Sequence, residues 1–235
     1  MRISFSVIIP VWFEASHIAR QIEHVFTRAA ESDADVEIIV ADGDPQQSTL
    51  AVIQDTRVIP VAAPQGRAVQ MNAGAQAASK DILVFLHADT TLPPRAFALI
   101  ADAFQSHGSA KAGAFALRIA SSSPFLYGIA KLANWRNSLT RTPYGDQAQF
   151  FYRTYFEALG GFEPIPIMED VAIMRLIRKR GDGLAMVETP VVTSARRWAA
   201  EGIFRCTLRN LVLRFLYGAG VSAHTLSNWY RAMKG

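Results

Sequence analysis

One stretch near the middle of the chain limits the possible folds more than any other. Residues 82–86, Ile-Leu-Val-Phe-Leu, form an unbroken apolar run that ends in the polar tip His87-Ala88-Asp89. An apolar run of this length is typical of a strand buried on both faces, as in a parallel sheet. In open α/β sheets, ligands bind just beyond the carboxyl ends of such strands. The run therefore predicts a carboxylate, Asp89, at the ligand-binding edge of a parallel sheet.

The same arrangement occurs twice earlier in the chain. Residues 7–10 lead to Glu14, and residues 38–41 lead to Asp42. Because the carboxyl ends of parallel strands meet at the same edge of a sheet, we expect three acids along one edge. Such an edge is suited to binding a nucleotide and a metal ion.

The remaining pattern is typical of an α/β protein. Alternating periodicity predicts strands over 4–11, 36–41, 58–62 and 82–86, and helices over 16–31, 46–55, 66–78 and 93–106. In the less regular second half we expect strands over 112–119, 150–152 and 191–194, and helices over 124–139, 154–159, 169–180, 202–217 and 222–232. The β-α order favours a parallel sheet with helices on both faces. No clear linker divides the 235 residues.

Two of the acids at the predicted edge have structural alternatives. A carboxylate at Asp42 suits hydrogen bonds from a nucleobase or from ribose hydroxyls, and it equally suits an Asx turn or a helix cap. Glu14 is explained as well by capping the following helix. Asp89 is the better metal ligand, because Mg²⁺ and Mn²⁺ prefer oxygen ligands completed by substrate phosphates. His87 is either a second ligand, a hydrogen-bonding group or a packing residue.

Gly66 leads into a predicted helix whose first turn carries Arg67. Helix N-termini favour phosphate, and a cation there reinforces this preference, although acids usually suit a first turn better than bases. The segment is neither a Walker loop nor a dinucleotide fingerprint, because it lacks both glycine patterns.

Glu169 and Asp170 begin another predicted helix, shortly after Asp146 and Gln147 in an aromatic-rich stretch. Acids in a first turn commonly stabilise the helix terminus. The functional alternative is a general base that takes a proton from an attacking hydroxyl.

Basic residues gather in the C-terminal quarter. Residues 175–235 hold 11 Lys and Arg against 3 Asp and Glu, whereas the preceding residues hold 13 against 17. This balance indicates either an anionic partner, such as ligand phosphates or an anionic membrane, or equally a solvated helix surface. Within it, Arg196, Arg197 and Trp198 either clamp a diphosphate or form a solvated turn. The single cysteine, Cys206, excludes an internal disulfide and is expected to be a buried, inert thiol.

Taken together, these segments resemble the family 2 glycosyltransferases, which have the GT-A fold. The resemblance covers about residues 4–198. It rests on the ordered motifs Ser6-Val7-Ile8-Ile9-Pro10 with Glu14, Val40-Ala41-Asp42-Gly43, Gly66-Arg67 with Asn72 and Gly74, Phe85-Leu86-His87-Ala88-Asp89, Gly160-Gly161-Phe162 and Glu169-Asp170. Each motif is weak alone, and their order makes the set specific. The segments GRAVQMNAGA, FLHADT and SARRW look like a bacterial subfamily.

The resemblance implies a Rossmann-like, mostly parallel sheet flanked by helices, with C-terminal helices. It implies one domain over residues 1–235, with a nucleotide-sugar-binding half at about 1–110, an acceptor and catalytic half at about 111–200, and a helical tail at about 201–235. The implied enzyme is an inverting, hexosyltransferase-like enzyme that uses a nucleoside-diphosphate sugar, an acceptor hydroxyl and Mn²⁺ or Mg²⁺. UDP is the default carrier, GDP stays open, and a lipid-linked acceptor is one option.

The resemblance also implies residue roles. Asp42 would bind the base, Glu14 would lie near the nucleoside, Asp89 would bind the metal with His87 as an uncertain second ligand, and Asp170 would be the general base. The other expected site residues are Glu169 beside the base; Pro10, Gly66, Arg67, Asn72 and Ala88 at the nucleotide; and Asp146, Gln147, Arg196, Arg197 and Trp198 at the acceptor or diphosphate.

The chain departs from the family pattern at two places. His87 replaces the first acid of the Asp-x-Asp motif, and Ala41 replaces an acid beside Asp42. These changes leave open a catalytically silent module that binds a nucleotide sugar or a partner. A sugar nucleotidyltransferase is disfavoured, because the loop at 11–16 lacks both glycine and a basic residue.

The predicted helix over 202–217 carries an apolar stripe. Its members are Ile203, Phe204, Leu208, Leu211, Val212, Phe215 and Leu216, with Arg205, Arg209 and Arg214 beside them. Such a helix could lie on an anionic membrane, but packing against the core or a second subunit is the favoured alternative. No window of about 18 residues is free of charge and turn signals, so we expect no transmembrane helix. We expect a cytoplasmic protein, with peripheral membrane contact or a homodimer as options, and no nucleic-acid partner.

Overall fold

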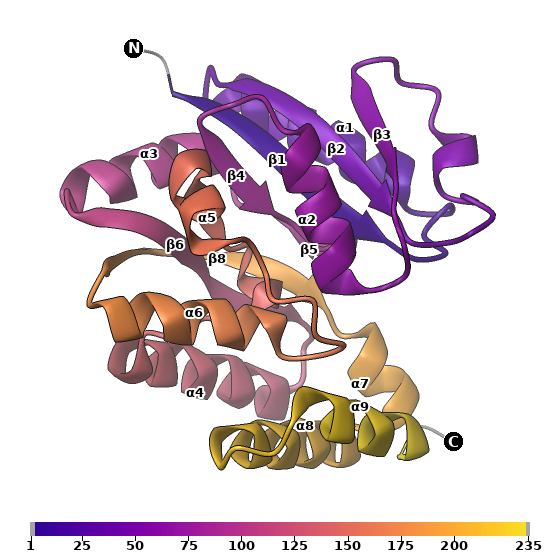
Figure 1. Ribbon diagram of the computed structural model, residues 1–235, viewed down its shortest axis with the longest axis vertical. Coiled ribbons are helices and arrows are strands. Elements are labelled where there is room, and N and C mark those ends of the chain that lie inside the picture. Colours follow the sequence, from indigo (N-terminus) through magenta and orange to yellow (C-terminus); the bar gives the residue numbers. More distant parts are fainter. Residues whose placement is uncertain (1–2, 234–235) are drawn as a thin grey trace.

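Eight strands form one sheet in the computed structural model, which describes residues 3–233 (Figure 1). They are β1 (Ser4–Val11), β2 (Asp35–Asp42), β3 (Val58–Ala62), β4 (Ile82–Phe85), β5 (Thr90–Thr91), β6 (Ala110–Ala120), β7 (Phe150–Tyr152) and β8 (Gly183–Ser194). The order across the sheet is β3-β2-β1-β4-β7-β6-β8-β5. The β3–β2, β2–β1, β1–β4 and β6–β8 pairs are parallel, and the other pairs are antiparallel.

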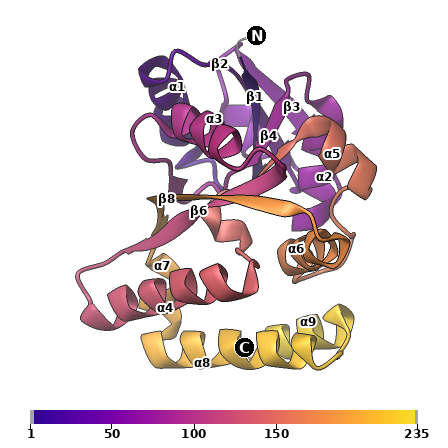
Figure 2. The ribbon, with the colours of Figure 1, turned by 90° about the vertical axis from the view of Figure 1, so that its left-hand side faces the viewer.

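Helices cover both faces of this sheet and one end of it. They are α1 (Ile18–Glu31), α2 (Arg67–Ala77), α3 (Ala96–Ser106), α4 (Pro124–Thr140), α5 (Arg153–Leu159), α6 (Glu169–Arg180), α7 (Arg196–Glu201), α8 (Ile203–Gly218) and α9 (Ala223–Ala232), with short 3₁₀ turns η1 (Leu50–Val52) and η2 (Gly145–Gln147). Helices α1 and α3 lie on one face, and α2, α5 and α6 lie on the other (Figure 2). Helices α4, α7, α8 and α9 form a further group at one end. The expected α/β fold with flanking and C-terminal helices is confirmed.

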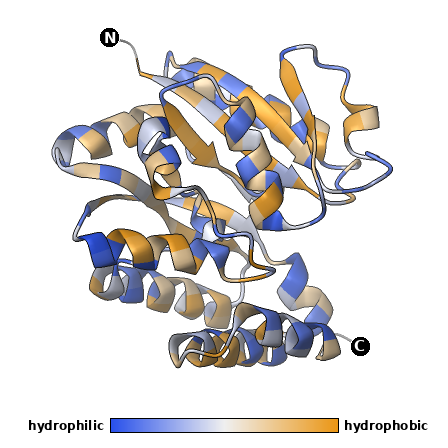
Figure 3. Cartoon of the chain, viewed as in Figure 1, coloured by the Kyte–Doolittle hydropathy of each residue, from blue (hydrophilic) through white to orange (hydrophobic). Residues whose placement is uncertain are grey.

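Side-chain alternation along the central strands builds two cores. On β1, Val7 and Ile9 pack toward α1 and α3, whereas Ile8 packs toward α2 and α6. The central strands are accordingly the most hydrophobic part of the chain (Figure 3). Helix α2 lies very close to β1, because a Cβ at Gly74 would come within 2.5 Å of the Ile8 Cγ2. Glycine at this position therefore sets the distance between the helix and the sheet.

Most expected elements are confirmed to within a few residues, but the helix expected over 46–55 is wrong. Only the 3₁₀ turn Leu50–Val52 forms there. The Asp44 carboxylate accepts hydrogen bonds from the backbone N–H groups of Gln46 and Ser48, at 3.0 and 3.2 Å. Such local bonds offer the backbone an alternative to a helix. The pattern also failed to predict β5, α7 and the first part of β8.

The carboxyl ends of the parallel strands meet at one edge. Val11 of β1 lies opposite Asp42 of β2, and Ile8 lies opposite Phe85 of β4. The loops that leave β1 and β2 therefore begin side by side, and the loop that leaves β4 begins beside the last residues of β1. As expected, Cys206 is buried. Among residues 3–233, no helix has both the length and the apolar composition needed to cross a bilayer.

Candidate active site

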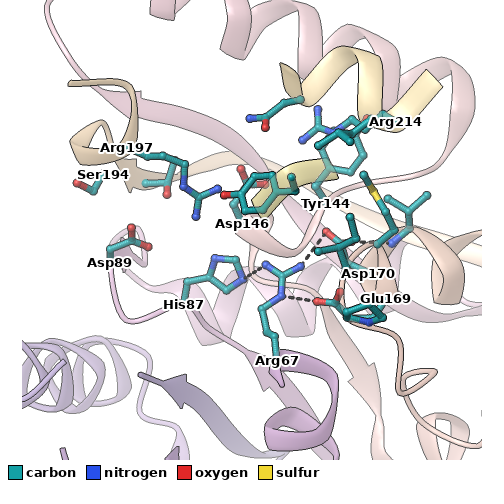
Figure 4. Close-up of a pocket in the computed structure, with 18 of the residues that line it drawn as sticks. Arg67, His87, Asp89, Tyr144, Asp146, Glu169, Asp170, Ser194, Arg197 and Arg214 are labelled. Atoms are coloured by element: carbon teal, nitrogen blue, oxygen red, sulfur yellow. Dashed lines mark hydrogen bonds and ion pairs between the residues drawn. The ribbon is translucent and has the colours of Figure 1, made fainter. Parts of the chain in front are cut away.

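A cavity of about 320 Å³ lies at this edge, between the sheet and the end group of helices. Side chains from α2, α6, α7, α8, η2, the end of β8 and the loop after β4 converge on it (Figure 4). The structure brings eight of the expected site residues together on its wall: Arg67, His87, Asp89, Asp146, Glu169, Asp170, Arg197 and Trp198.

Arg67 is the central cation of the cavity. It is the first residue of α2, directly after Gly66, whose positive φ of 142° turns the chain into the helix. Its guanidinium donates from Nε to the Glu169 carboxylate, lies 3.2 Å from the His87 Nε2, and lies 3.5 Å from the Asp170 Oδ2. Burial opposes its charge, but the two carboxylates outweigh burial and raise the pKa of Arg67. Arg67 therefore stays charged and ties α2 to the start of α6.

Asp170 is held by backbone donors at the wall of the cavity. Its Oδ2 accepts a hydrogen bond of 2.6 Å from the Gly145 N–H, and its Oδ1 accepts one of 2.9 Å from the Val171 N–H. Although burial opposes ionisation, Arg67 and these N–H donors lower the pKa of Asp170. A carboxylate has about four lone-pair sites, so this one remains able to accept a further hydrogen bond.

Glu169 has the opposite electrostatic balance. Its side chain is only 1% exposed, and burial raises its pKa despite the ion pair with Arg67. Adjacent carboxylates in one site push their pKa values apart in this way. The pair thus divides into an ionised Asp170 that faces the cavity and a Glu169 that holds Arg67.

His87 is an uncharged group in this structure. Burial and the neighbouring Arg67 lower the pKa of His87 to about 3. The imidazole is therefore neutral at physiological pH, and its Nε2 faces the guanidinium. This nitrogen is turned toward Arg67 as an acceptor.

Asp89 and Glu14 are joined by one arginine. Arg196 donates from Nη2 and Nη1 to the two Glu14 oxygens, at 2.5 and 3.2 Å, and its Nε lies 3.3 Å from the Asp89 Oδ2. The expected acids of β1 and β4 are therefore brought together, although Glu14 and Arg196 do not line the cavity itself.

Asp146 points a polar atom without a partner toward the cavity. Its Oδ1 is buried and accepts no hydrogen bond from the described residues. Burial raises the pKa of Asp146, which the cation of Arg214 only partly opposes. Nearby, Trp198 donates its indole N–H to the Thr207 hydroxyl at 3.3 Å, and Arg197 lies along the wall. The unpaired Asp146 Oδ1, at the wall of a cavity, is suited to accept a hydrogen bond from a donor group of a ligand.

Several expected site residues lie elsewhere. Asp42 is fully buried, and its carboxylate accepts backbone N–H groups from Asp44, Thr49 and Leu50, as in the turn-capping alternative. Asn72 exchanges hydrogen bonds of 2.8 and 2.9 Å with the backbone of Phe162. These two residues are committed to local structure, and their nucleotide roles stay predictions.

Three further expected residues lie away from the cavity wall, and their site roles stay predictions. Gln147 bridges the backbone of Phe115 and Tyr144 inside the protein. Pro10 pairs with Ala41 in the sheet, and Ala88 packs against the core.

The sequence pattern missed Tyr144 and Arg214 on the wall of the cavity, and Arg136 beside Tyr144. Tyr144, 9% exposed, is contacted by two guanidiniums, those of Arg136 and Arg214, each with its Cζ 3.5 Å from the ring centroid. Arg214 was expected beside the apolar stripe of α8, with no role in the site, but it lines the cavity. One sequence feature could have indicated this role for Arg214: its charge interrupts the most apolar segment of the C-terminal region.

The sequence of residues 6–182 matches the model of the family described as Glycosyl transferase family 2. A search of curated proteins finds no match.

Solved glycosyltransferase structures share the fold. The mannosyltransferase PcManGT from Pyrobaculum calidifontis, in complex with GDP-Man and Mn²⁺, is similar with a TM-score of 0.67 and 19% identity, over 94% of this chain and 66% of that one. TarS 1–349 from S. aureus with UDP is similar with a TM-score of 0.62 and 14% identity, over 82% of this chain and 60% of that one. The same TarS segment with UDP-GlcNAc has the same TM-score and identity. The chain thus spans about three fifths to two thirds of the length of these proteins.

Proposed function

This chain belongs to glycosyltransferase family 2, and from that premise we propose that it moves a sugar from a nucleoside-diphosphate sugar to an acceptor hydroxyl. The observation that carries the proposal is the Asp170 carboxylate. It is fixed by two backbone N–H donors at a cavity whose other wall carries Asp89, at the carboxyl end of the strand β4. The complexes of PcManGT with GDP-Man and of TarS with UDP-GlcNAc support a nucleotide sugar as the donor class.

Asp170 acts in this proposal as the general base. Its lowered pKa keeps it ionised at neutral pH, so it is ready to accept a proton. The acceptor oxygen attacks the anomeric carbon while its proton passes to Asp170. The bond from that carbon to the diphosphate breaks, and the electron pair leaves with the diphosphate. A single displacement of this kind inverts the anomeric configuration.

Cations stabilise the charge that grows on the departing diphosphate. Arg67 is fixed by Glu169 and Asp170, so its guanidinium needs no reorganisation during the reaction. Arg197 lies on the same wall, and no ion pair within the described residues occupies it. Its planar fork of donors matches phosphate oxygens. Glu169 is a positioning residue in this scheme, because it contacts Arg67 and not the reacting atoms.

A divalent metal fits the site only as a group shared with the substrate. Within residues 3–233, no three His, Cys, Asp or Glu side chains form a metal cluster. Mg²⁺ is commonly held by one or two carboxylates together with substrate phosphates, and Asp89 supplies one such carboxylate. Its Oδ2 pairs with Arg196, and its Oδ1 has no partner among the described residues. Asp89 would hold the ion, which would supply Lewis-acid stabilisation of the diphosphate.

The proposal is tested by turnover of nucleotide sugars by wild-type protein and by Asp170→Asn. The assay follows release of nucleoside diphosphate from UDP- and GDP-sugars, including slow hydrolysis of the donor. We expect wild-type turnover and a loss of roughly 10²–10⁴-fold in Asp170→Asn, the usual contribution of a general base. Donor binding should persist, because the amide keeps the size of the carboxylate.

Asp102→Asn is the matched control, because Asp102 is an exposed acid on α3. Binding of donor without any turnover by the wild type would favour the catalytically silent module instead.

A further inference from the structure

A second cavity, of about 190 Å³, lies behind Asp170 and between α4, α6 and α8. Arg136, Arg175, Arg178 and Arg214 line it, and no acidic residue does. It adjoins the larger cavity, because Tyr144, Met168, Val171 and Arg214 line both. We name it the arginine pocket, after these four guanidiniums.

The two inner guanidiniums of the arginine pocket, those of Arg136 and Arg214, have N–H donors that lack acceptors among the described residues. Within residues 3–233, Arg214 makes no hydrogen bond and no close ion pair, although it contacts the ring of Tyr144. Arg136 donates from Nη2 to the Asn137 side chain and the Thr142 carbonyl, but its buried Nε has no partner. Burial of donors without acceptors is costly, so a ligand that accepts these hydrogen bonds would be favoured.

Their charges are only partly balanced. Burial and the charge of Arg214 lower the pKa of Arg136 to about 10, and burial lowers the pKa of Arg214, although Asp146 and Asp170 oppose both shifts. At the rim, Arg175 donates to the Tyr217 carbonyl at 3.4 Å and Arg178 donates to the Thr140 carbonyl at 3.3 Å. Each exposed rim guanidinium therefore keeps further donors. A compact anion with several oxygens would relieve the repulsion and satisfy both layers of donors.

We propose that the arginine pocket binds a phosphate group carried by the acceptor. This inference rests on the proposed function, because it uses Asp170 as the base. Figure 4 shows Tyr144 and Arg214 on the opposite side of the cavity from Asp89 and His87. Neither Asp89 nor His87 lines the arginine pocket. A phosphate held there leaves the donor edge free and directs the rest of the acceptor toward Asp170.

The first test is calorimetric titration with inorganic phosphate, in the presence of saturating UDP or GDP so that the donor edge is filled. We expect phosphate to bind wild-type protein and to bind Arg136→Gln or Arg214→Gln at least about tenfold more weakly, as for loss of one charge-assisted contact. Arg118→Gln, which removes an exposed arginine outside the pocket, is the control. Nucleotide binding by Arg136→Gln reports that the variant is folded.

Two outcomes separate this inference from the proposed function. If phosphate does not bind, or binds all variants equally, the proposal that the arginine pocket binds phosphate is overturned. This holds even if the nucleotide binds and the nucleotide sugar is turned over. Phosphate binding without any nucleotide binding overturns the proposed function instead. Transfer to glycerol 3-phosphate, compared with transfer to a long-chain alkyl phosphate in vesicles, then distinguishes a soluble acceptor from a lipid one.

An independent observation concerns α4 and α8, which turn their apolar sides to solvent. On α8 the exposed stripe is Phe204, Leu208, Leu211, Val212 and Phe215, and on α4 it is Phe125, Leu132, Trp135 and Leu139. Polar side chains face inward instead: Asn137 and Arg209 are buried, and Arg209 pairs with Glu201 at 2.5 Å. The helices lie side by side (Figures 1 and 2), and the rings of Phe125 and Phe204 lie 4.8 Å apart.

The stripe expected on α8 therefore does not pack on the core of the described chain. The exposed charges near it are basic: within 121–145 and 202–233, Lys131, Arg141, Arg205 and Arg231 are exposed, and these ranges contain no Asp or Glu. Apolar side chains within an acid-free, basic surface are complementary to an anionic bilayer. We propose that the joint face of α4 and α8 docks on the surface of an anionic phospholipid membrane.

Flotation with vesicles tests this second inference. We expect the protein to float with phosphatidylglycerol vesicles at low salt, to float less at high salt, and not to float with phosphatidylcholine alone. Phe204→Ser with Phe215→Ser should weaken binding roughly tenfold or more, through lost apolar burial. Val52→Ser, at an exposed apolar side chain on η1, is the control. The membrane assignment is overturned if the protein does not float with the vesicles. It is also overturned if sedimentation shows a dimer that Phe215→Ser dissociates.

Discussion

At the scale of single residues, the site depends on how Arg67 balances two buried carboxylates. Arg67 contacts Glu169, Asp170 and His87 at once, and these contacts join α2, α6 and the loop after β4. Together with burial, this guanidinium lowers the pKa of His87, and together with backbone N–H donors it lowers the pKa of Asp170. Arg67 therefore contributes to the protonation state of both groups.

We expect Arg67→Met to destabilise the protein, and to do so more at higher pH. It leaves Glu169 buried without its cation, which costs roughly 1–3 kcal/mol, below the value for a fully buried pair because Arg67 is 38% exposed. Glu169 already has a raised pKa, and the variant raises it further. A raised carboxyl pKa means that the folded state prefers the protonated form, so stability falls as pH rises through that pKa.

Urea denaturation of Arg67→Met at about pH 5 and about pH 7.5 measures this difference, because the loss should be smaller at the lower pH. Arg57→Met, which removes an exposed pair with Asp55, should cost little at either pH. An equal loss at both values would contradict the role given to Glu169.

Gly145 is the second residue on which the site depends. A Cβ there would lie 3.2 Å from the Asp170 Oδ2 and 3.3 Å from the His87 Nε2. We expect Gly145→Ala to displace these groups and to lower kcat by about 10–100-fold, because a small misplacement of a catalytic group is expensive. Thermal unfolding should shift little. Gly128→Ala, on the exposed side of α4 with no atom within 4 Å, is the control. An unchanged kcat in Gly145→Ala would contradict the proposed role of Asp170 as the general base.

At the scale of elements, the strands of the sheet can be predicted well from the sequence, whereas the helices at the end of the sheet can be predicted only poorly. The apolar runs of β1, β2 and β4 are largely buried on both faces, so composition alone marks them, whereas the edge strand β3 is buried only at Val58. Short α7 and two-residue β5 have no such signal. On α8, helical periodicity locates the apolar stripe but cannot tell which way it faces.

The same limit applies to the candidate site. Strand ends and helix starts correctly bring Asp89, Asp170 and Arg67 to one cavity. Side chains that bond to a distant backbone, such as Asn72 with Phe162, look identical in sequence to ligand-binding ones. Arg214 reaches the site through tertiary packing of α8, which no local pattern describes.

Asn72 gives a test at this scale, because its amide joins α2 to the loop after α5. We expect Asn72→Ala to lose about 1–3 kcal/mol of stability, since both backbone groups of Phe162 lose their partner. Nucleotide affinity should change less than about threefold, well under the tenfold that 1.4 kcal/mol represents. Chemical denaturation and calorimetry measure the two effects separately. If Asn72→Ala greatly lowered the nucleotide affinity without lowering stability, Asn72 would instead be a nucleotide-binding residue.

At the scale of the whole molecule, the sheet edge and the end group of helices supply different residues of the proposed site. The edge supplies Asp89 and Arg67, and α4 and α8 supply Arg136 and Arg214, which lie beside Tyr144. The proposed donor and acceptor sites therefore meet at one carboxylate. Helices α4 and α8 reach this meeting point with their polar sides and expose their apolar sides.

The most direct test of the account is calorimetric titration of the whole chain with nucleoside diphosphates, each with and without Mn²⁺ or Mg²⁺. UDP and GDP come first, on wild-type protein, on Asp89→Ala, and on Asp102→Ala as an exposed control. The account predicts that one nucleotide binds, that the metal strengthens binding, and that Asp89→Ala removes the metal dependence. Absence of binding to every nucleotide under every metal condition would contradict the donor site at the end of β4.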